Sequence, residues 1–230
     1  MKRTLLILAL TAYILTVAKS QDCSSVYFPQ NENAQLEYRQ FDRSDKLLGS
    51  AIQTISEIRN TTNGIEATVD IQSIDAGGKS LGESQIIAKC EKGIYYLDMS
   101  NYFNRESMEA FEDMEMTIKG GGLELPSNLK AGDDLKGGEM TLSIASGGMT
   151  IMNMAITISN RKVEAVENLT TPAGTFECYK ISFMVTTKMM GTMQTKGVEW
   201  YTKDIGMVKS ESYGNDGKLA GYTLLTNLKK

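Results

Sequence analysis

Short runs of alternating apolar and polar residues, separated by turn residues, cover most of this chain beyond residue 64. The run 65–71 places an apolar residue at every second position, which is the pattern of a strand with one buried and one wet face. Similar runs recur as far as Thr226, and turns such as Asn215-Asp216-Gly217 join them. Consecutive strands with short connections pair antiparallel. The sequence therefore predicts a mainly β fold.

One segment departs from this alternation. Residues 104–114 place Met108 and Phe111 at helical spacing, group acidic residues on the other side, and begin at a capping Asn104, so we expect a short helix there. The predicted strands number about ten, which is too many for one flat sheet. We therefore expect a strongly curled, open antiparallel half-barrel wrapped around this one helix.

The first twenty residues have the organisation of a secretory signal peptide. Lys2 and Arg3 precede an apolar run, which is followed by Ala18-Lys19-Ser20, a small-x-small cleavage signal for signal peptidase. The apolar run of roughly fourteen residues is shorter than the roughly twenty that a bilayer-spanning helix needs. We expect residues 1–20 to be removed, and residues 21–230 to form a single β-rich domain with no membrane-spanning segment. No lipobox precedes Cys23, so we expect no lipid anchor.

Composition excludes several classes of function. The 24 basic residues fall to 21 without Lys2, Arg3 and Lys19, against 28 acidic residues, so the mature net charge is −7. An acidic chain without a basic stripe argues against nucleic acid, and against electrostatic docking on anionic lipid. The absence of histidine excludes Ser-His-Asp and Cys-His catalysis and histidine-ligated metals. We therefore expect that the protein is not an enzyme and that it binds no cofactor.

Three cysteines allow at most one intramolecular disulfide. Cys90 and Cys178 each lie in or at the end of a strand-like run, so they are the favoured pair. Cys23 lies in a start that we expect to be flexible. Three isolated thiols remain an open alternative.

Methionine is the most unusual part of the composition, because twelve of the 14 methionines lie between Met99 and Met193. Plain core packing, the lining of an apolar ligand site and thioether ligation of Cu(I) all remain open as explanations. The apolar faces of two strand-like runs are the candidate ligand lining. Their residues are Met152, Met154, Ile156 and Ile158, and Tyr179, Ile181, Phe183 and Val185.

Three motifs in the last third carry a family resemblance. They are Thr-Pro-Ala-Gly-Thr-Phe-Glu-Cys-Tyr-Lys over residues 171–180, Gly-Val-Glu-Trp-Tyr over 197–201 and Ile-Gly-Met-Val-Lys-Ser-Glu over 205–211. The chain resembles exported Bacteroidetes proteins of unknown function called TapB-like or YmcC-like. The resemblance implies a LolA-like fold, in which an unclosed antiparallel sheet binds lipid tails or other apolar ligands on its concave side. It also implies a periplasmic location, with secretion beyond the outer membrane as the open alternative.

Two functions follow as expectations. The first is an exported periplasmic protein that binds or carries an apolar ligand, such as a lipid acyl chain. The alternative is a structural or interaction protein of the cell envelope, with a packed core, envelope proteins as partners and no ligand. A cavity larger than a few hundred Å3 would argue against the alternative.

Overall fold

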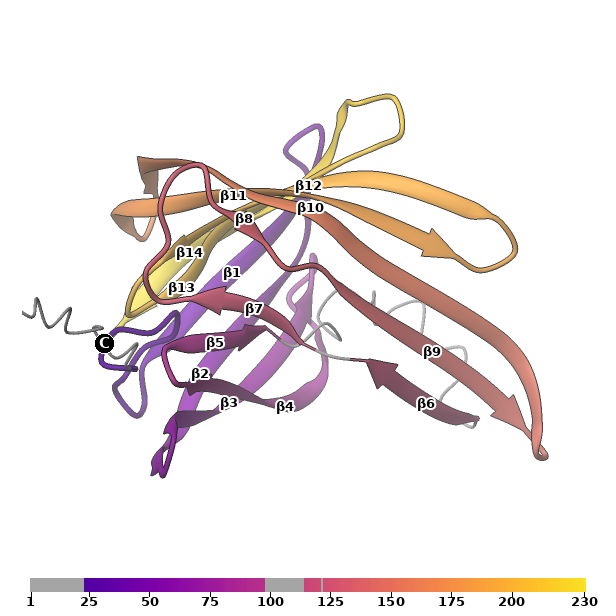
Figure 1. Cartoon of the computed structure of the whole chain (residues 1–230), viewed down its shortest axis with the longest axis horizontal. Coiled ribbons are helices and arrows are strands. Elements are labelled where there is room, and N and C mark those ends of the chain that lie inside the picture. Colours follow the sequence, from indigo (N-terminus) through magenta and orange to yellow (C-terminus); the bar gives the residue numbers. More distant parts are fainter. Residues whose placement is uncertain (1–22, 98–113, 121) are drawn as a thin grey trace, which may run out of the picture.

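The computed structural model describes residues 23–97, 114–120 and 122–230. In this part of the chain, fourteen strands form one sheet in which every pairing is antiparallel (Figure 1). The strands are β1 (Gln35–Asp42), β2 (Leu47–Thr61), β3 (Gly64–Asp75), β4 (Ser80–Glu91), β5 (Ile94–Leu97), β6 (Glu115–Gly120), β7 (Leu123–Pro126), β8 (Asp134–Leu135), β9 (Gly138–Ser146), β10 (Met149–Thr171), β11 (Gly174–Lys188), β12 (Thr192–Thr202), β13 (Gly206–Tyr213) and β14 (Leu219–Lys229).

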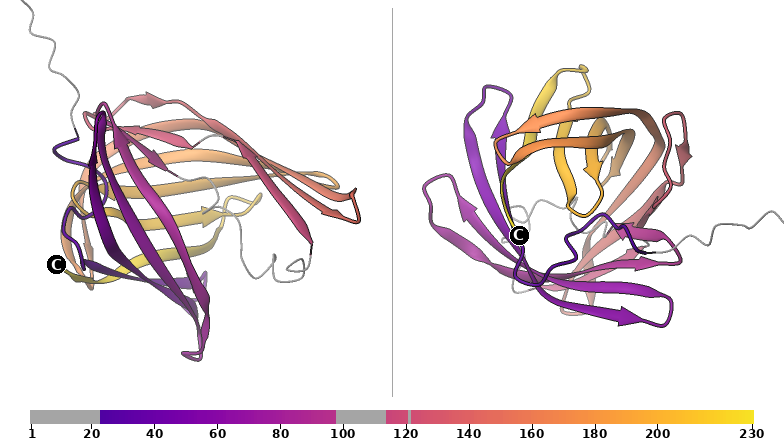
Figure 2. Two further views of the ribbon diagram at one scale, coloured as in Figure 1. Left: turned by 90° about the horizontal axis from the view of Figure 1, so that it is seen from below. Right: turned by 90° about the vertical axis from the view of Figure 1, so that its left-hand side faces the viewer.

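The sheet order explains the strong curl of the molecule. The order is β6-β9-β10-β11-β12-β13-β14-β1-β2-β3-β4-β5-β7, with β8 paired to β10. The two edge strands, β6 and β7, are consecutive in the chain, and only residues 121 and 122 separate them. Opposite edges this close in sequence require the sheet to bend back on itself, as Figure 2 shows. The mainly antiparallel, unclosed sheet predicted from the alternation is confirmed.

Arg161 holds the curled sheet together next to its β7 edge. The register of β10 shifts between Ser159 and Lys162, and Asn160 within this bulge has a positive φ of 52°. The bulge re-aims the next side chain. Arg161 is only 3% exposed, and its Nη1 donates to the carbonyl oxygens of Glu124 at 2.9 Å and Lys136 at 2.7 Å. Its guanidinium therefore ties β7 to the long central strand β10.

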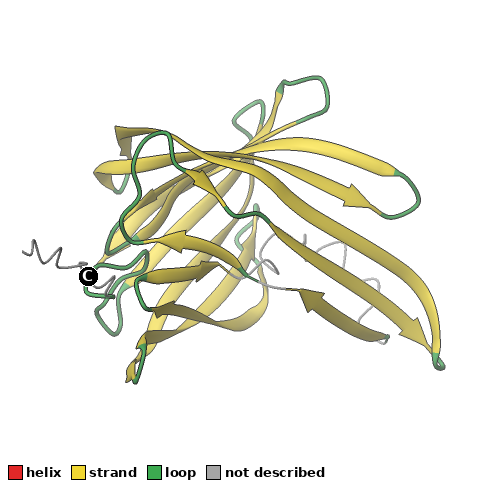
Figure 3. Cartoon of the chain, in the orientation of Figure 1, coloured by secondary structure: helices red, strands yellow, loops and turns green. Residues whose placement is uncertain are grey.

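The part of the fold prediction that is wrong is a half-barrel wrapped around a helix. The described residues contain strands, turns and loops but no helix (Figure 3). Residues 104–113 of the expected helix lie outside the described residues, and Met114 forms a bend. Within those same bounds, no helix is long and apolar enough to cross a membrane.

An extended N-terminal segment packs against the sheet where a helix was expected. Val26, Tyr27 and Phe28 are at most 3% exposed. Tyr27 joins the core cluster formed with β5, β7 and β9–β12, whereas Val26 and Phe28 join the cluster formed by β2, β3 and β4. Aromatic and aliphatic side chains bury apolar area without needing helical geometry. The helical spacing in residues 104–114 could not reveal that the N-terminal segment packs here.

The disulfide prediction is also wrong. Cys90 pairs with Cys23, with a Cα–Cα distance of 5.9 Å, and Cys178 is a free, buried thiol. Cys90 lies in the core cluster against which the N-terminal segment packs, so Cys23 is brought beside it. Cys178 lies on β11, seven strands from β4 in the sheet order, and packs in another cluster with Trp200.

The buried Cys178 thiol should resist modification in the native protein. Burial, followed by the charges of Glu167 and Glu177, raises its pKa to about 12, so little thiolate forms at about pH 8. We expect one thiol per chain to react with Ellman's reagent in denaturant without reductant, and almost none in native buffer. Rapid native labelling, or three reactive thiols in denaturant, would contradict the pairing of Cys23 with Cys90.

Candidate functional site

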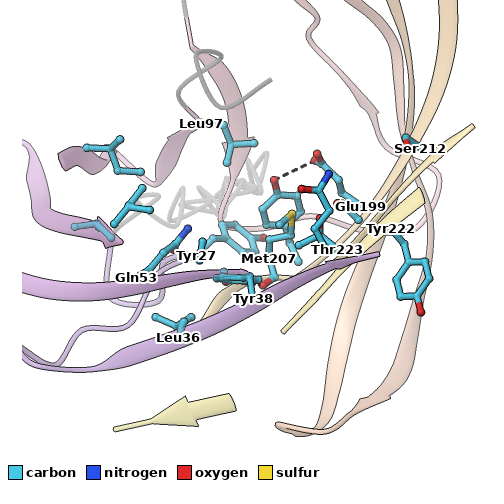
Figure 4. Close-up of a pocket in the computed structure, with 18 of the residues that line it drawn as sticks. Tyr27, Leu36, Tyr38, Gln53, Leu97, Glu199, Met207, Ser212, Tyr222 and Thr223 are labelled. Atoms are coloured by element: carbon cyan, nitrogen blue, oxygen red, sulfur yellow. Dashed lines mark hydrogen bonds between the residues drawn. The ribbon is translucent and has the colours of Figure 1, made fainter. Parts of the chain in front are cut away.

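The concave side of the sheet encloses an open cavity of about 890 Å3. Strands β1–β4 form one wall, and β11–β14 form the other (Figure 4). The N-terminal segment contributes Tyr27, Phe28 and Pro29. This volume lies within the range of roughly 300–1,000 Å3 that is typical of small-molecule sites.

The strand register explains why these side chains point into one space. Leu36 on β1 faces Gln53 on β2, Gln53 faces Ile71 on β3, and Ile71 faces Ser84 on β4. Directly paired residues share one face of a sheet, and all four line the cavity. The neighbouring row of Ile55, Val69 and Ile86 lines it as well. The first wall is therefore mainly aliphatic.

A polar row runs across the opposite wall. Glu199 on β12 faces Ser210 on β13, Ser210 faces Thr223 on β14, and Thr223 faces Gln40 on β1. All four residues line the cavity. Glu199 is 8% exposed, and its Oε2 accepts a hydrogen bond of 3.0 Å from the hydroxyl of Tyr201 (Figure 4). The cavity therefore combines the mainly aliphatic wall of β1–β4 with a row of hydrogen-bonding groups that crosses β12–β14 and ends on β1. Apolar residues such as Phe183 and Met207 lie beside that row.

Aromatic rings form the part of the cavity lining around Tyr27. Its ring centroid lies 6.0 Å from that of Tyr95 and 6.2 Å from that of Tyr201, with Tyr179 also at 6.2 Å. These separations suit tilted and edge-to-face aromatic packing. Burial, followed by the proximity of Tyr179, raises the pKa of the Tyr27 hydroxyl, which donates to the carbonyl oxygen of Pro126 at 3.2 Å. Tyr27 is therefore a neutral, fixed part of the cavity wall.

The structure divides the eight predicted lining residues into two groups. Phe183 and Val185 line the cavity. Ile156, Ile158 and Ile181 are buried in a core cluster, against which Met154 and Tyr179 pack. Met152 is half-buried and does not line the cavity.

Most of the cavity wall comes from β1–β4 and β12–β14, for which the sequence patterns predicted no lining role. The alternation in residues 65–71 marks one face of β3, and Val69 and Ile71 lie on it. That pattern could have identified the apolar wall. Nothing comparable marks the polar row, because serine, threonine and glutamine are equally common on solvated faces.

The methionines have several different environments. Met140 is buried, and Met154 packs against the same core cluster. Met149, Met189, Met190 and Met193 are exposed beside turns. In the described ranges, no three Cys, Asp or Glu side chains are grouped so that they could hold a metal ion.

Comparisons with known proteins identify relatives of the whole sheet. A model of the DUF3108-like family matches residues 31–225. The crystal structure of a Bacteroides fragilis protein, described as exported and YmcC-like in fold, has a TM-score of 0.76 and 25% identity; the match covers 90% of this chain and 100% of that one.

A second crystal structure, of a Parabacteroides distasonis protein described as a lipoprotein, has a TM-score of 0.77 and 24% identity; the match covers 91% of this chain and 100% of that one. The second likeness shows the fold alone. A search of curated proteins found no significant match. The resemblance stated from the sequence motifs is confirmed by the family model and the two structures.

Proposed function

This chain belongs to the DUF3108-like family, and on that premise we propose that it is an exported periplasmic protein that binds an apolar ligand, such as a lipid acyl chain, in its concave cavity. The observation that carries this proposal is the volume of about 890 Å3 faced by the aliphatic wall of β1–β4. An acyl chain would bury its methylene groups against Leu36, Ile71 and Ile86, each group contributing roughly 0.8 kcal/mol.

Three observations support export. Residues 1–20 have the order of a secretory leader. The disulfide between Cys23 and Cys90 suits an oxidising compartment. One structural relative is described as exported and the other as a lipoprotein.

The cavity favours ligand binding over a purely structural role. A packed envelope protein would leave few voids larger than a water molecule. The curled sheet instead leaves about 890 Å3 open on its concave side. Tyrosine, serine and glutamate, which line this cavity, are common lining groups of binding sites.

A matched pair of tryptophan variants tests the proposal. Ser84 lines the cavity. Its neighbour Gln85 lies exposed on the other face of β4, where its Nε2 donates a hydrogen bond to Asp70 Oδ1. Ser84→Trp should fill part of the cavity and weaken binding of a fluorescent fatty-acid probe by roughly tenfold or more, which corresponds to about 1.4 kcal/mol. Gln85→Trp should leave probe binding unchanged.

Native mass spectrometry provides the second measurement. Protein purified from its own host without detergent should carry lipid-sized adducts that organic extraction removes. The proposal fails if the wild-type protein carries no lipid and does not bind the probe. It also fails if the two tryptophan variants lose the same affinity, because the loss would then not come from the cavity.

A further inference from the structure

Two β-hairpins end in exposed apolar residues at the same end of the molecule. The β9–β10 hairpin carries Met149, 74% exposed, and Ile151, 56% exposed. The β11–β12 hairpin carries Met190, 96% exposed, with Met189 and Met193 each at 53%. We call residues 146–151 and 188–193 the methionine tips; both project toward the right in Figure 1. Large apolar side chains that cluster in the open mark interaction sites.

The local charge at the second methionine tip differs in sign from the net charge of the chain. Residues 140–160, which include the first tip, carry no charged side chain. Residues 178–198, which include the second, carry three lysines and no Asp or Glu. Lys188, in the second tip, and Lys196, beside it, are both exposed. The nearest acidic residue by strand pairing is Glu115 on β6, opposite Ala145. This end is therefore apolar, and its second tip is locally basic.

These residues match a lipid surface better than a protein partner. Protein interfaces concentrate binding energy in Trp, Tyr and Arg, and neither methionine tip contains any of them. Unbranched methionine and aliphatic groups can enter the boundary between headgroups and acyl chains. Lysine stems extend along apolar surface while their ammonium groups reach anionic headgroups.

We propose that the two methionine tips dock this protein onto the surface of an anionic lipid bilayer. The net charge alone argues against such docking, but salt screens charges more than about 10 Å away. Lys188 lies within the second tip, and Lys196 lies three residues beyond it on the same hairpin. The proposal goes beyond the cavity ligand and does not depend on it, because no residue of either tip lines the cavity; of the two lysines, only Lys196 does.

Vesicle flotation of the mature, oxidised chain tests the docking. Vesicles of phosphatidylcholine alone are compared with vesicles that also contain phosphatidylglycerol. We expect binding to be roughly tenfold stronger to the anionic vesicles, and to weaken as salt is added. The double variant Met149→Glu/Met190→Glu should lose binding to both vesicles. Lys188→Glu/Lys196→Glu should lose only the preference for phosphatidylglycerol.

Ile87 provides the matched control, because it is 47% exposed on β4, away from both tips. Ile87→Glu should bind vesicles like the wild type. The methionine double variant should retain its circular dichroism and its binding of the fatty-acid probe, which separates this proposal from the cavity function. Absence of wild-type binding, or equal losses in the Ile87 and methionine variants, overturns the proposal. A wild-type dimer in light scattering that the methionine substitutions dissociate also overturns it, because the tips would then bind a second copy.

Discussion

Replacing Cys23 with serine should lower the free energy of unfolding by about 4 kcal/mol, as expected when a disulfide that closes a loop of this length is lost. The bond joins residues 67 positions apart and attaches the N-terminal segment to β4. Without it, the burial of Val26, Tyr27 and Phe28 must by itself hold that segment against the sheet. A loss of this size is a large fraction of the 5–15 kcal/mol that stabilises a typical domain.

Urea unfolding, followed by the fluorescence of Trp200, measures this effect with and without reductant. Cys90→Ser should match Cys23→Ser, and the double variant should be no less stable than either, because all three lack the same bond. Cys178→Ala serves as the control and should remain sensitive to reductant. A wild-type protein with the same midpoint in both conditions would refute the expected stabilisation.

Replacing Arg161 with methionine should lower the free energy of unfolding by about 3 kcal/mol. The change keeps an unbranched side chain but removes the donor to the carbonyl oxygens of Glu124 and Lys136. Unsatisfied buried acceptors lose their hydration without compensation, which is the larger part of the expected cost. The contact between β7 and β10 should therefore loosen.

Lys136 provides a control in the same contact region. Its Nζ lies 3.1 Å from Glu124 Oε1, but its side chain is 76% exposed. Exposed ion pairs contribute between zero and about 1 kcal/mol, so Lys136→Met should change stability little. Equilibrium unfolding of the two variants makes the comparison. Equal losses would mean that the buried hydrogen bonds of Arg161 do not hold this edge.

Local pattern predicted the strands well because it depends on neighbours along the chain. The alternation in residues 65–71 marks β3 and its buried face. The same two-residue period correctly grouped Ile156 with Ile158 on β10, and Ile181 with Phe183 on β11. It could not tell which of these side chains another strand covers. Ile181 is 1% exposed in the core, whereas Val185, four residues further along the same face of β11, lines the cavity.

Contacts between distant residues account for the two errors. Cys178 lies in a strand, as expected, but pairing requires its Cα to approach another within about 7 Å. The path of the N-terminal segment placed Cys23 there instead. Likewise, helical spacing in residues 104–114 could not reveal that Tyr27 packs against the curled sheet. Arg161 would pass for a surface residue in the sequence, because only the β10 bulge turns it inward.

The amino-acid sequence by itself determined that this chain forms an antiparallel sheet of many strands, because residue alternation and turn chemistry act over a few neighbouring positions. The family motifs between Thr171 and Glu211 are also visible there. Only the tertiary structure decided the Cys23–Cys90 bond, the inward position of Arg161 and the two walls of the cavity. Each of these joins residues that are far apart in the chain, and it exists only once the sheet has curled.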